Sequence, residues 1–141
     1  MTNQAIILLA EDNMDDVFLI EKALARAGLT HQLVHVEDGE QCIKYLRGEP
    51  PYDDRSKHPL PNLLLLDLKM PKVSGPQVLE WMHGQPHLKE LPVIILTGSI
   101  LPEDREEAVA KGVADFHVKP VQFVDLVRIM QALQARWLAK G

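Results

Sequence analysis

The chain has 141 residues, of which 46% are hydrophobic and 25% are charged, a composition typical of one globular domain with its own core. Its formal net charge of -5 comes from 20 acidic and 15 basic residues without a basic stripe along one face, so we expect no nucleic-acid binding. The single cysteine, Cys42, excludes an internal disulfide and is expected to be a buried thiol. The N-terminus lacks signal-peptide features and the apolar runs are too short to span a bilayer, so we expect a cytoplasmic protein without membrane contact.

Short apolar runs of strand length alternate with longer stretches of helical periodicity along the chain. This alternation predicts βαβ units, and therefore an α/β fold with a doubly wound, five-stranded parallel sheet and helices on both faces. All five pairs are expected in a single domain, residues 1–141. The predicted strands are residues 6–10, 32–36, 62–66, 93–96 and 115–118, and the predicted helices are residues 14–27, 40–46, 77–82, 103–111 and 123–137.

Two segments depart from a minimal alternation of this kind. Residues 49–61 contain four prolines and no apolar periodicity, which predicts a long surface loop. The last predicted helix is apolar on more than one stripe, because Val124 and Leu138 fall outside the main face. Surplus apolar surface indicates a protein contact, and a wide core face is the alternative interpretation.

Four predicted strands stop on, or just before, residues with phosphate or metal chemistry: Glu11 and Asp12, Asp67, Thr97, and Lys119. The carboxyl ends of parallel strands meet at one edge of a sheet, so we expect these side chains to converge there. Each has an ordinary alternative, such as a helix cap for Asp12 or Thr97 and a surface lysine for Lys119. The coincidence at successive strand ends favours one shared site.

The chemistry of this set fits phosphoryl transfer to a carboxylate. Asp67 lies before a proline-containing turn at the rim of the sheet, where it could attack a phosphoryl group. Because anion then meets anion, a cation is needed, and Glu11 and Asp12 are expected to hold Mg²⁺ through oxygen ligands. Thr97 could donate a hydrogen bond to a phosphoryl oxygen, and Lys119 could neutralise its charge.

The segments that carry these residues, LLAEDN, LLLLDLKMPKVSG, VIILTGS and DFHVKP, resemble those of the receiver domain of two-component response regulators, a flavodoxin-like fold. The resemblance covers nearly the whole chain. It implies that Asp67 is phosphorylated by a partner histidine kinase and that Asp12 binds Mg²⁺ directly. It also implies that Glu11 acts on the metal through water and that the backbone carbonyl of Lys69 completes the protein ligands.

The same resemblance implies a switch. Thr97 matches the hydroxyl that moves toward the phosphoryl group, and Gly98 matches the small residue that leaves the phosphate accessible. Phe116 falls at the aromatic switch position, where an inward ring accompanies activation, although an ordinary core residue is the alternative. Lys119 matches the family's lysine, and the Lys119–Pro120 peptide bond is one that the family usually holds cis.

The proline-rich loop and the C-terminal ARWL motif resemble those of single-domain regulators that partner bacterial phytochrome histidine kinases. That subgroup commonly forms homodimers, which we expect here through the fourth helix, fifth strand and fifth helix. We expect no output domain after the last helix, so the effect would come through a protein contact or a change of oligomer. A phosphate sink or shuttle, and a receiver-fold binding module that works without phosphorylation, remain alternatives.

Rival functions fit the residues less well. An aspartate-based phosphatase would need an acid two residues after Asp67, where the chain has Lys69, so we expect slow self-dephosphorylation rather than enzymatic turnover. A dinucleotide site would need a glycine-rich turn in place of Glu11 and Asp12. His83 and His87 have helical spacing, but a proline interrupts the turn, so all six histidines are interpreted as surface or structural residues.

Overall fold

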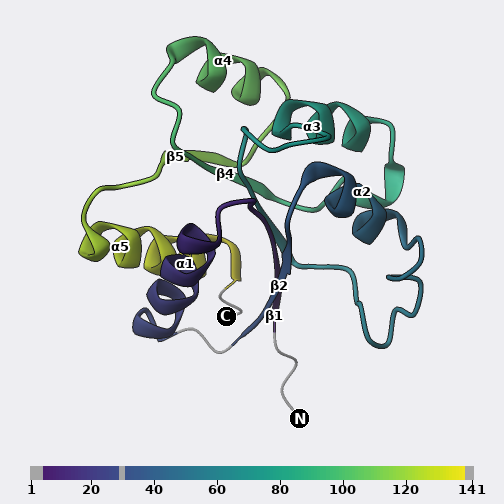
Figure 1. Ribbon diagram of the computed structural model, residues 1–141, viewed down its shortest axis with the longest axis horizontal. Coiled ribbons are helices and arrows are strands. Elements are labelled where there is room, and N and C mark those ends of the chain that lie inside the picture. The colour runs from purple at the N-terminus through teal and green to yellow at the C-terminus, as the bar shows by residue number, and fades with distance from the viewer. Residues whose placement is uncertain (1–4, 29–30, 139–141) are drawn as a thin grey trace.

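The computed structural model describes residues 5–28 and 31–138, which form one five-stranded parallel sheet with helices on both faces (Figure 1). The strand order is β2-β1-β3-β4-β5, so the predicted fold class is confirmed. The strands are β1 (Ala5–Ala10), β2 (His31–Val36), β3 (Leu63–Leu66), β4 (Val93–Thr97) and β5 (Asp115–Val118). The helices are α1 (Met14–Arg26), α2 (Gly39–Arg47), α3 (Gly75–His83), α4 (Pro102–Ala110) and α5 (Phe123–Leu133), with a short 3-10 turn at Pro86–Leu88.

Alternate residues of the central strands point into two separate hydrophobic cores, one on each face of the sheet. Leu8 and Leu64 face the layer that contains α2 and α3, whereas Ile7 and Leu63 face α1 and α5. All four side chains are fully buried. Both faces of β1 and β3 are therefore apolar, and polar residues are confined to the strand ends.

Capping residues fix where the helices begin and end. The Asp38 side chain accepts a hydrogen bond from the Gln41 N–H at 2.8 Å, and Gly48 ends α2 with a φ of 78°. Helix α3 begins two residues before its predicted start at Gln77, because Ser74 and Gln77 form a reciprocal capping box.

The last helix differs from its predicted range, residues 123–137. The α-helix ends at Leu133, and the chain continues in a wider π turn, Gln134–Leu138. The bonds of a π turn span one residue more than those of an α-helix, so the last apolar residues leave the original stripe. Trp137 and Leu138 still pack against the core on the α1 and α5 side.

The proline-rich segment is a loop, as predicted, and it is anchored to α2. The hydroxyl of Tyr45, a fully buried residue, donates a hydrogen bond to the Pro59 carbonyl at 2.9 Å. The guanidinium of Arg55 donates to the carbonyls of Leu46 and His58 at 3.0 and 2.9 Å. These bonds satisfy buried polar groups and hold the loop in a defined shape.

The start of α3 lies unusually close to the end of β3. The Gly75 N–H donates to the Leu68 carbonyl at 2.9 Å, and a Cβ on Gly75 would lie 2.5 Å from the Asp67 carbonyl oxygen. Only glycine fits there without moving the backbone that carries Asp67.

Gly75→Ala is expected to lower the free energy of unfolding by about 1–3 kcal/mol, because the added methyl overlaps backbone atoms. Gly98→Ala is the matched control, since a Cβ there would meet no atom within 4 Å. Urea unfolding of both variants measures the difference, and equal stabilities would contradict this account of the close approach.

Candidate functional site

Backbone hydrogen bonds continue the sheet one residue beyond the strands and place the predicted site residues at one edge. The Asp67 N–H donates to the Ala10 carbonyl at 3.1 Å, and the Glu11 N–H donates to the last residue of β2 at 3.1 Å. The Lys119 N–H donates to the Thr97 carbonyl at 2.7 Å. The residues that follow β1, β3 and β5 are thus fixed by the sheet itself.

Three carboxylates meet at this edge. Glu11, Asp12 and Asp67 each offer an oxygen within 4.8 Å of the others, and Glu11 is 1% exposed. Burial raises the pKa of Glu11 to about 7; a hydrogen bond from Lys119 opposes this shift, and the charge of Asp67 adds to it. Three oxygen donors of this kind suit a hard divalent cation.

Lys119 is the cation that the structure provides for this cluster. Its Nζ lies 2.9 Å from Glu11 Oε1, 3.0 Å from Asp67 Oδ2 and 2.7 Å from Asp16 Oδ2. Burial alone would lower the pKa of Lys119, but the hydrogen bonds to Asp16 and Glu11 and the charge of Asp67 outweigh it and raise the pKa. The ammonium therefore stays charged and links three elements of the fold.

Two residues of this arrangement were not predicted. Asp16 lies in the first turn of α1, 103 positions from the lysine that it contacts, so no local pattern marks it. His35, on β2, donates through Nε2 to the Glu11 carbonyl at 2.7 Å and steadies the turn after β1. The paired acids Asp15 and Asp16 after a helix start were the only signal in the sequence, and helix capping explains such acids equally well.

The rim of the site is a chain of polar contacts around Asp104 of α4. The Thr97 side chain is fully buried, and its hydroxyl oxygen accepts a hydrogen bond from the Ser99 N–H at 3.3 Å. The Ser99 hydroxyl donates to Asp104 Oδ2 at 2.5 Å, and Lys69 Nζ lies 3.7 Å from the same carboxylate oxygen. The two contacts to Asp104 join the loops after β3 and β4. The Lys69 N–H also donates to Asp67 Oδ1 at 3.4 Å.

Phe116 points inward from β5. Its ring is 7% exposed and belongs to the core on the side of α2, α3 and α4. The Arg105 guanidinium of α4 lies 5.4 Å from the ring centroid, a cation–π distance. Helix α4 therefore contacts both predicted switch regions. Its Asp104 binds Ser99, two residues after Thr97, and its Arg105 lies over the ring of Phe116.

The expected cis bond between Lys119 and Pro120 is wrong for this structure. Pro50–Pro51 is the cis peptide bond within residues 5–28 and 31–138, and Lys119–Pro120 is trans. The trans isomer of an X-Pro bond is the more stable by about 0.5–1 kcal/mol, so local energetics favour the form observed.

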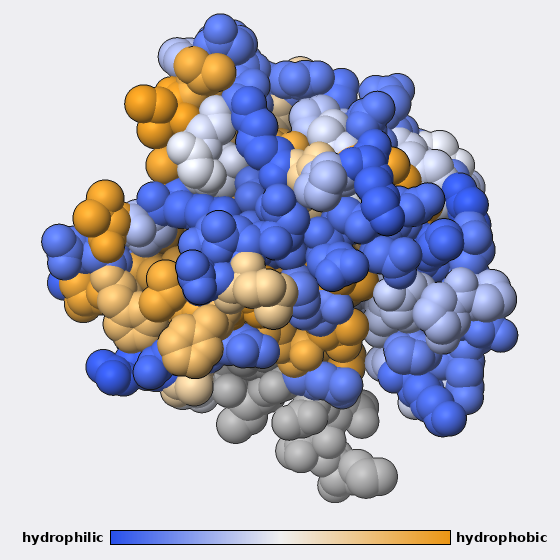
Figure 2. Space-filling view, viewed as in Figure 1, coloured by the Kyte–Doolittle hydropathy of each residue, from blue (hydrophilic) through white to orange (hydrophobic). Residues whose placement is uncertain are grey.

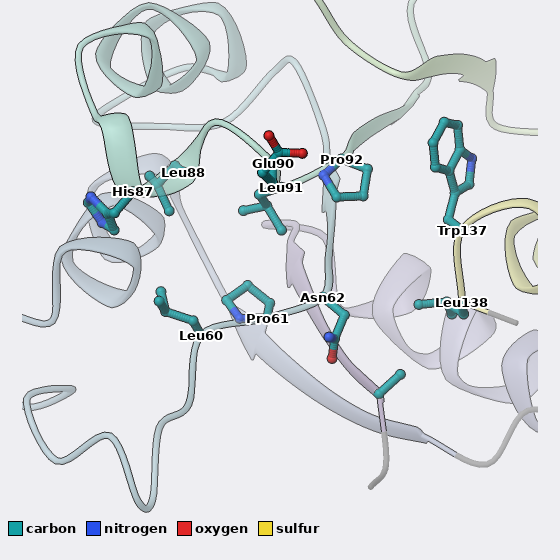
Figure 3. Close-up of a pocket in the computed structure, with 11 residues that line it drawn as sticks. Leu60, Pro61, Asn62, His87, Leu88, Glu90, Leu91, Pro92, Trp137 and Leu138 are labelled. Atoms are coloured by element: carbon teal, nitrogen blue, oxygen red, sulfur yellow. The ribbon is translucent and has the colours of Figure 1, made fainter. Parts of the chain in front are cut away.

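One hollow of the molecule lies away from these carboxylates. It has a volume of about 440 Å³ and is found at the opposite end of the sheet, between the turn before β4 and the end of α5 (Figure 3). Leu60, Pro92 and Trp137 line it, so it is mainly apolar. It brings no cluster of acids together and does not belong to the site at the strand ends.

His83 and His87, which the sequence suggested are surface or structural residues, each lie close to a backbone carbonyl. His83 Nε2 donates to the Lys111 carbonyl at 2.9 Å, and His87 Nε2 lies 3.4 Å from the Leu46 carbonyl. Cys42 is fully buried, and burial followed by the charge of Asp38 raises the pKa of its thiol to about 12. In the part of the chain that the structure describes, no helix is both long and apolar enough to cross a bilayer.

A five-stranded parallel sheet with carboxylates and a lysine at its carboxyl edge defines a class, and comparison with known proteins names it. Residues 7–131 match the family model of the response regulator receiver domain, so the chain belongs to that family. It is 35% identical over 133 residues to the probable methanogenesis regulatory protein FilR2 of Methanothrix harundinacea, covering 94% of this chain and 83% of that protein. It is 32% identical over 133 residues to the response regulator Rcp1 of Synechocystis, covering 94% and 88%.

Solved structures agree with this assignment. The phosphorylated cyanobacterial phytochrome response regulator RcpA superposes with a TM-score of 0.88 at 34% identity, over 99% of this chain and 97% of that chain. The Mn²⁺-bound form of Rcp1 superposes with a TM-score of 0.85 at 31% identity, over 97% and 96%. A relative of this fold thus binds a divalent metal, which is the chemistry that the acidic cluster fits.

Glu11→Gln is expected to change how stability depends on pH. The folded protein holds the Glu11 proton more tightly than the unfolded chain, so this stabilisation is complete below pH 4.5 and is lost as pH rises through about 7. The side-chain amide of Gln does not titrate in this range. Between these pH values, the free energy of unfolding of the native chain should therefore fall by about 2–3 kcal/mol relative to that of Glu11→Gln.

Urea unfolding with EDTA, at intervals between pH 4.5 and 7.5, measures this difference. Lys119 does not contribute to it, because its raised pKa keeps the ammonium charged throughout the range. A constant difference between the two proteins across the range would contradict the raised pKa of Glu11.

Proposed function

We propose that this chain is a single-domain regulator, residues 1–141, that accepts a phosphoryl group on Asp67 from a histidine kinase. The observation that carries the proposal is the meeting of Asp67 with two further carboxylates and the Lys119 ammonium at one edge of the sheet. An Asp67 oxygen attacks phosphorus, the phosphorus–nitrogen bond to the kinase histidine breaks, and the imidazole leaves with that electron pair and takes a proton. The product is an aspartyl phosphate.

The metal we propose is Mg²⁺, held by Glu11, Asp12 and Asp67 with the backbone carbonyl of Lys69. A bound divalent cation would offset the negative charge of acceptor and donor, which otherwise repel each other. Lys119 supplies the remaining positive charge, because its ammonium lies 3.0 Å from Asp67 Oδ2. These residues orient a phosphoryl group but offer no second acid after Asp67, so we propose slow self-dephosphorylation and no enzymatic turnover.

The switch that we propose begins at Thr97 and ends at α4. A phosphoryl group at Asp67 adds charge and acceptor oxygens that attract the Thr97 hydroxyl and the Lys119 ammonium. Thr97 is hydrogen-bonded to Ser99, and Ser99 to Asp104, so a movement of Thr97 would displace the start of α4. Phe116 would follow, because Arg105 of the same helix covers its ring.

The pathway that we propose is that of a bacterial phytochrome histidine kinase acting in the cytoplasm. Support comes from Rcp1 and from RcpA, whose structure is that of a cyanobacterial phytochrome response regulator. FilR2, a probable methanogenesis regulator, is comparably similar, so phosphotransfer from candidate kinases is the direct test. Service as a phosphate sink or shuttle uses the same site, and a binding module that works without phosphorylation uses only the surface.

Asp67→Asn is expected to abolish phosphorylation by acetyl phosphate with Mg²⁺, because the neutral amide oxygen is a much weaker nucleophile than a carboxylate oxygen. Asp53→Asn, at an exposed position in the proline-rich loop, removes the same charge away from the site and should be phosphorylated like the native chain. Intact-protein mass spectrometry counts the phosphoryl groups. Undiminished uptake by Asp67→Asn would overturn the assignment of the acceptor.

A homodimer through α4, β5 and α5 is the second part of this proposal. Figure 2 shows hydrophobic atoms gathered near α4 and the start of α5. The exposed fractions of apolar residues on and beside these elements are large: Ile100 79%, Leu101 48%, Val109 55%, Val118 41%, Val121 97% and Val124 54%. Apolar area of this kind on adjacent elements is typical of an interface.

Val124→Asp is expected to raise the dissociation constant of the dimer about tenfold or more, because the interface would bury an unpaired charge. Leu60→Asp, at an apolar position that is 43% exposed and lies outside α4, β5 and α5, is the control. Sedimentation equilibrium at tens of micromolar protein measures the constants. Weak interfaces form at this protein concentration, so a native chain that stays monomeric at it would contradict the dimer.

A further inference from the structure

Lys119 has one carboxylate partner that stands outside the acidic cluster. Asp16 Oδ2 lies 2.7 Å from the ammonium nitrogen, closer than the oxygens of Glu11 and Asp67. The cluster of carboxylates close enough to share a metal consists of Glu11, Asp12 and Asp67, and Asp16 is not a member. Of the three carboxylates that contact Lys119, a metal would therefore bind those of Glu11 and Asp67 but not that of Asp16.

The local structure holds Asp16 in this place. Asn13 caps α1 and accepts a hydrogen bond from the Asp16 N–H at 3.0 Å, which fixes the backbone of the first helical turn. A carboxylate at this point is also favoured by the positive end of the helix dipole. Helix α1 packs against α5, which follows the loop of Lys119, so the two side chains are brought together by the packing of these helices.

Asp16 and Lys119 border a small hollow of about 40 Å³ together with Leu19, Leu96 and Leu126. The Lys119 side chain is 20% exposed and that of Asp16 is 31% exposed, so the pair is partly shielded from water. Partial burial strengthens a charge-assisted hydrogen bond relative to one on an open surface. The contact can therefore restrict the position of the ammonium.

We infer that Asp16 is a positioning residue that retains Lys119 beside the site when a divalent cation engages Glu11 and Asp67, and thereby strengthens binding of that cation. This inference rests on the proposed function and deepens it. In the structure the ammonium contacts three carboxylates. When a cation neutralises two of them, Asp16 becomes the main counter-charge of Lys119, so the Asp16 contact is stronger in the metal-bound state.

The consequence follows from linkage between the two contacts. An interaction that is stronger in the bound state than in the free state increases affinity by that difference. Without Asp16, the ammonium would stay closer to Glu11 and Asp67, where it competes with the metal and repels it. An ordinary surface ion pair would have the same strength in both states and would leave metal affinity unchanged.

The test measures Mg²⁺ affinity by isothermal titration calorimetry. Asp16→Asn should raise the dissociation constant about fivefold to tenfold relative to the native chain, the range of a partly shielded charge-assisted bond. Asp15→Asn is the matched control, because it removes the same charge from the same helical turn at an exposed position. It should change the constant by about twofold or less.

A second background isolates the route through the lysine. In Lys119→Met the ammonium is gone, so adding Asp16→Asn should change Mg²⁺ affinity by about twofold or less, as Asp15→Asn does. Lys119→Ala serves the same purpose if the methionine variant does not fold. A fivefold or larger loss that persists in this background would mean that Asp16 acts on the metal directly and would overturn the inference.

The two levels of the account fail in different ways. If the native chain binds Mg²⁺ and Asp16→Asn matches Asp15→Asn, the role of Asp16 is overturned while the metal site stands. If the native chain binds no Mg²⁺, the proposed function is overturned, and the inference falls with it.

Discussion

The structure depends on the balance of charge at the edge of its sheet, between the carboxylates of Glu11, Asp12 and Asp67 and the ammonium of Lys119. Glu11 and Asp67 are almost fully buried, and burial of neighbouring like charges is costly unless a cation stands among them. Lys119 meets this need, because its ammonium nitrogen lies within 3.0 Å of a carboxylate oxygen of both residues. A metal ion or a phosphoryl group would change these contacts, so we propose that the interaction that supports the fold is also the start of a switch.

The sheet supplies the precision that this balance requires. Glu11, Asp67 and Lys119 each come directly after a strand, and a backbone hydrogen bond to a neighbouring strand fixes each of them. The residues around the site are equally specific. His35 donates a hydrogen bond to the Glu11 carbonyl, and Gly75, which has no Cβ, allows α3 to begin close to the backbone of Asp67. Asp104 contacts Ser99 and Lys69 and so joins the loops after β3 and β4, which is the route by which we propose that a displacement at Asp67 reaches α4.

The sequence was sufficient to predict the fold class, the order of the elements and the convergence of Glu11, Asp12, Asp67 and Lys119, because strand ends in a parallel sheet share an edge. Asp16, His35 and Asp104 were missed, since each acts from a different element across distances that only the packed structure defines. The π turn at the end of α5 and the trans form of Lys119–Pro120 likewise depend on local geometry that apolar periodicity does not encode. Local patterns thus predict which residues come together, and packing decides which neighbours they bind.

Binding of beryllofluoride, a phosphoryl mimic, followed by NMR of the backbone amides with and without Mg²⁺, tests the central claim most directly. The account predicts that beryllofluoride with Mg²⁺ shifts the amides around Asp67, those from Thr97 through the start of α4, and that of Phe116. Beryllofluoride alone should shift none of them, because the carboxylates would repel the mimic without the cation. Shifts that are confined to the residues around Asp67, with Thr97, α4 and Phe116 unchanged, would contradict the claim that this charge balance operates a switch.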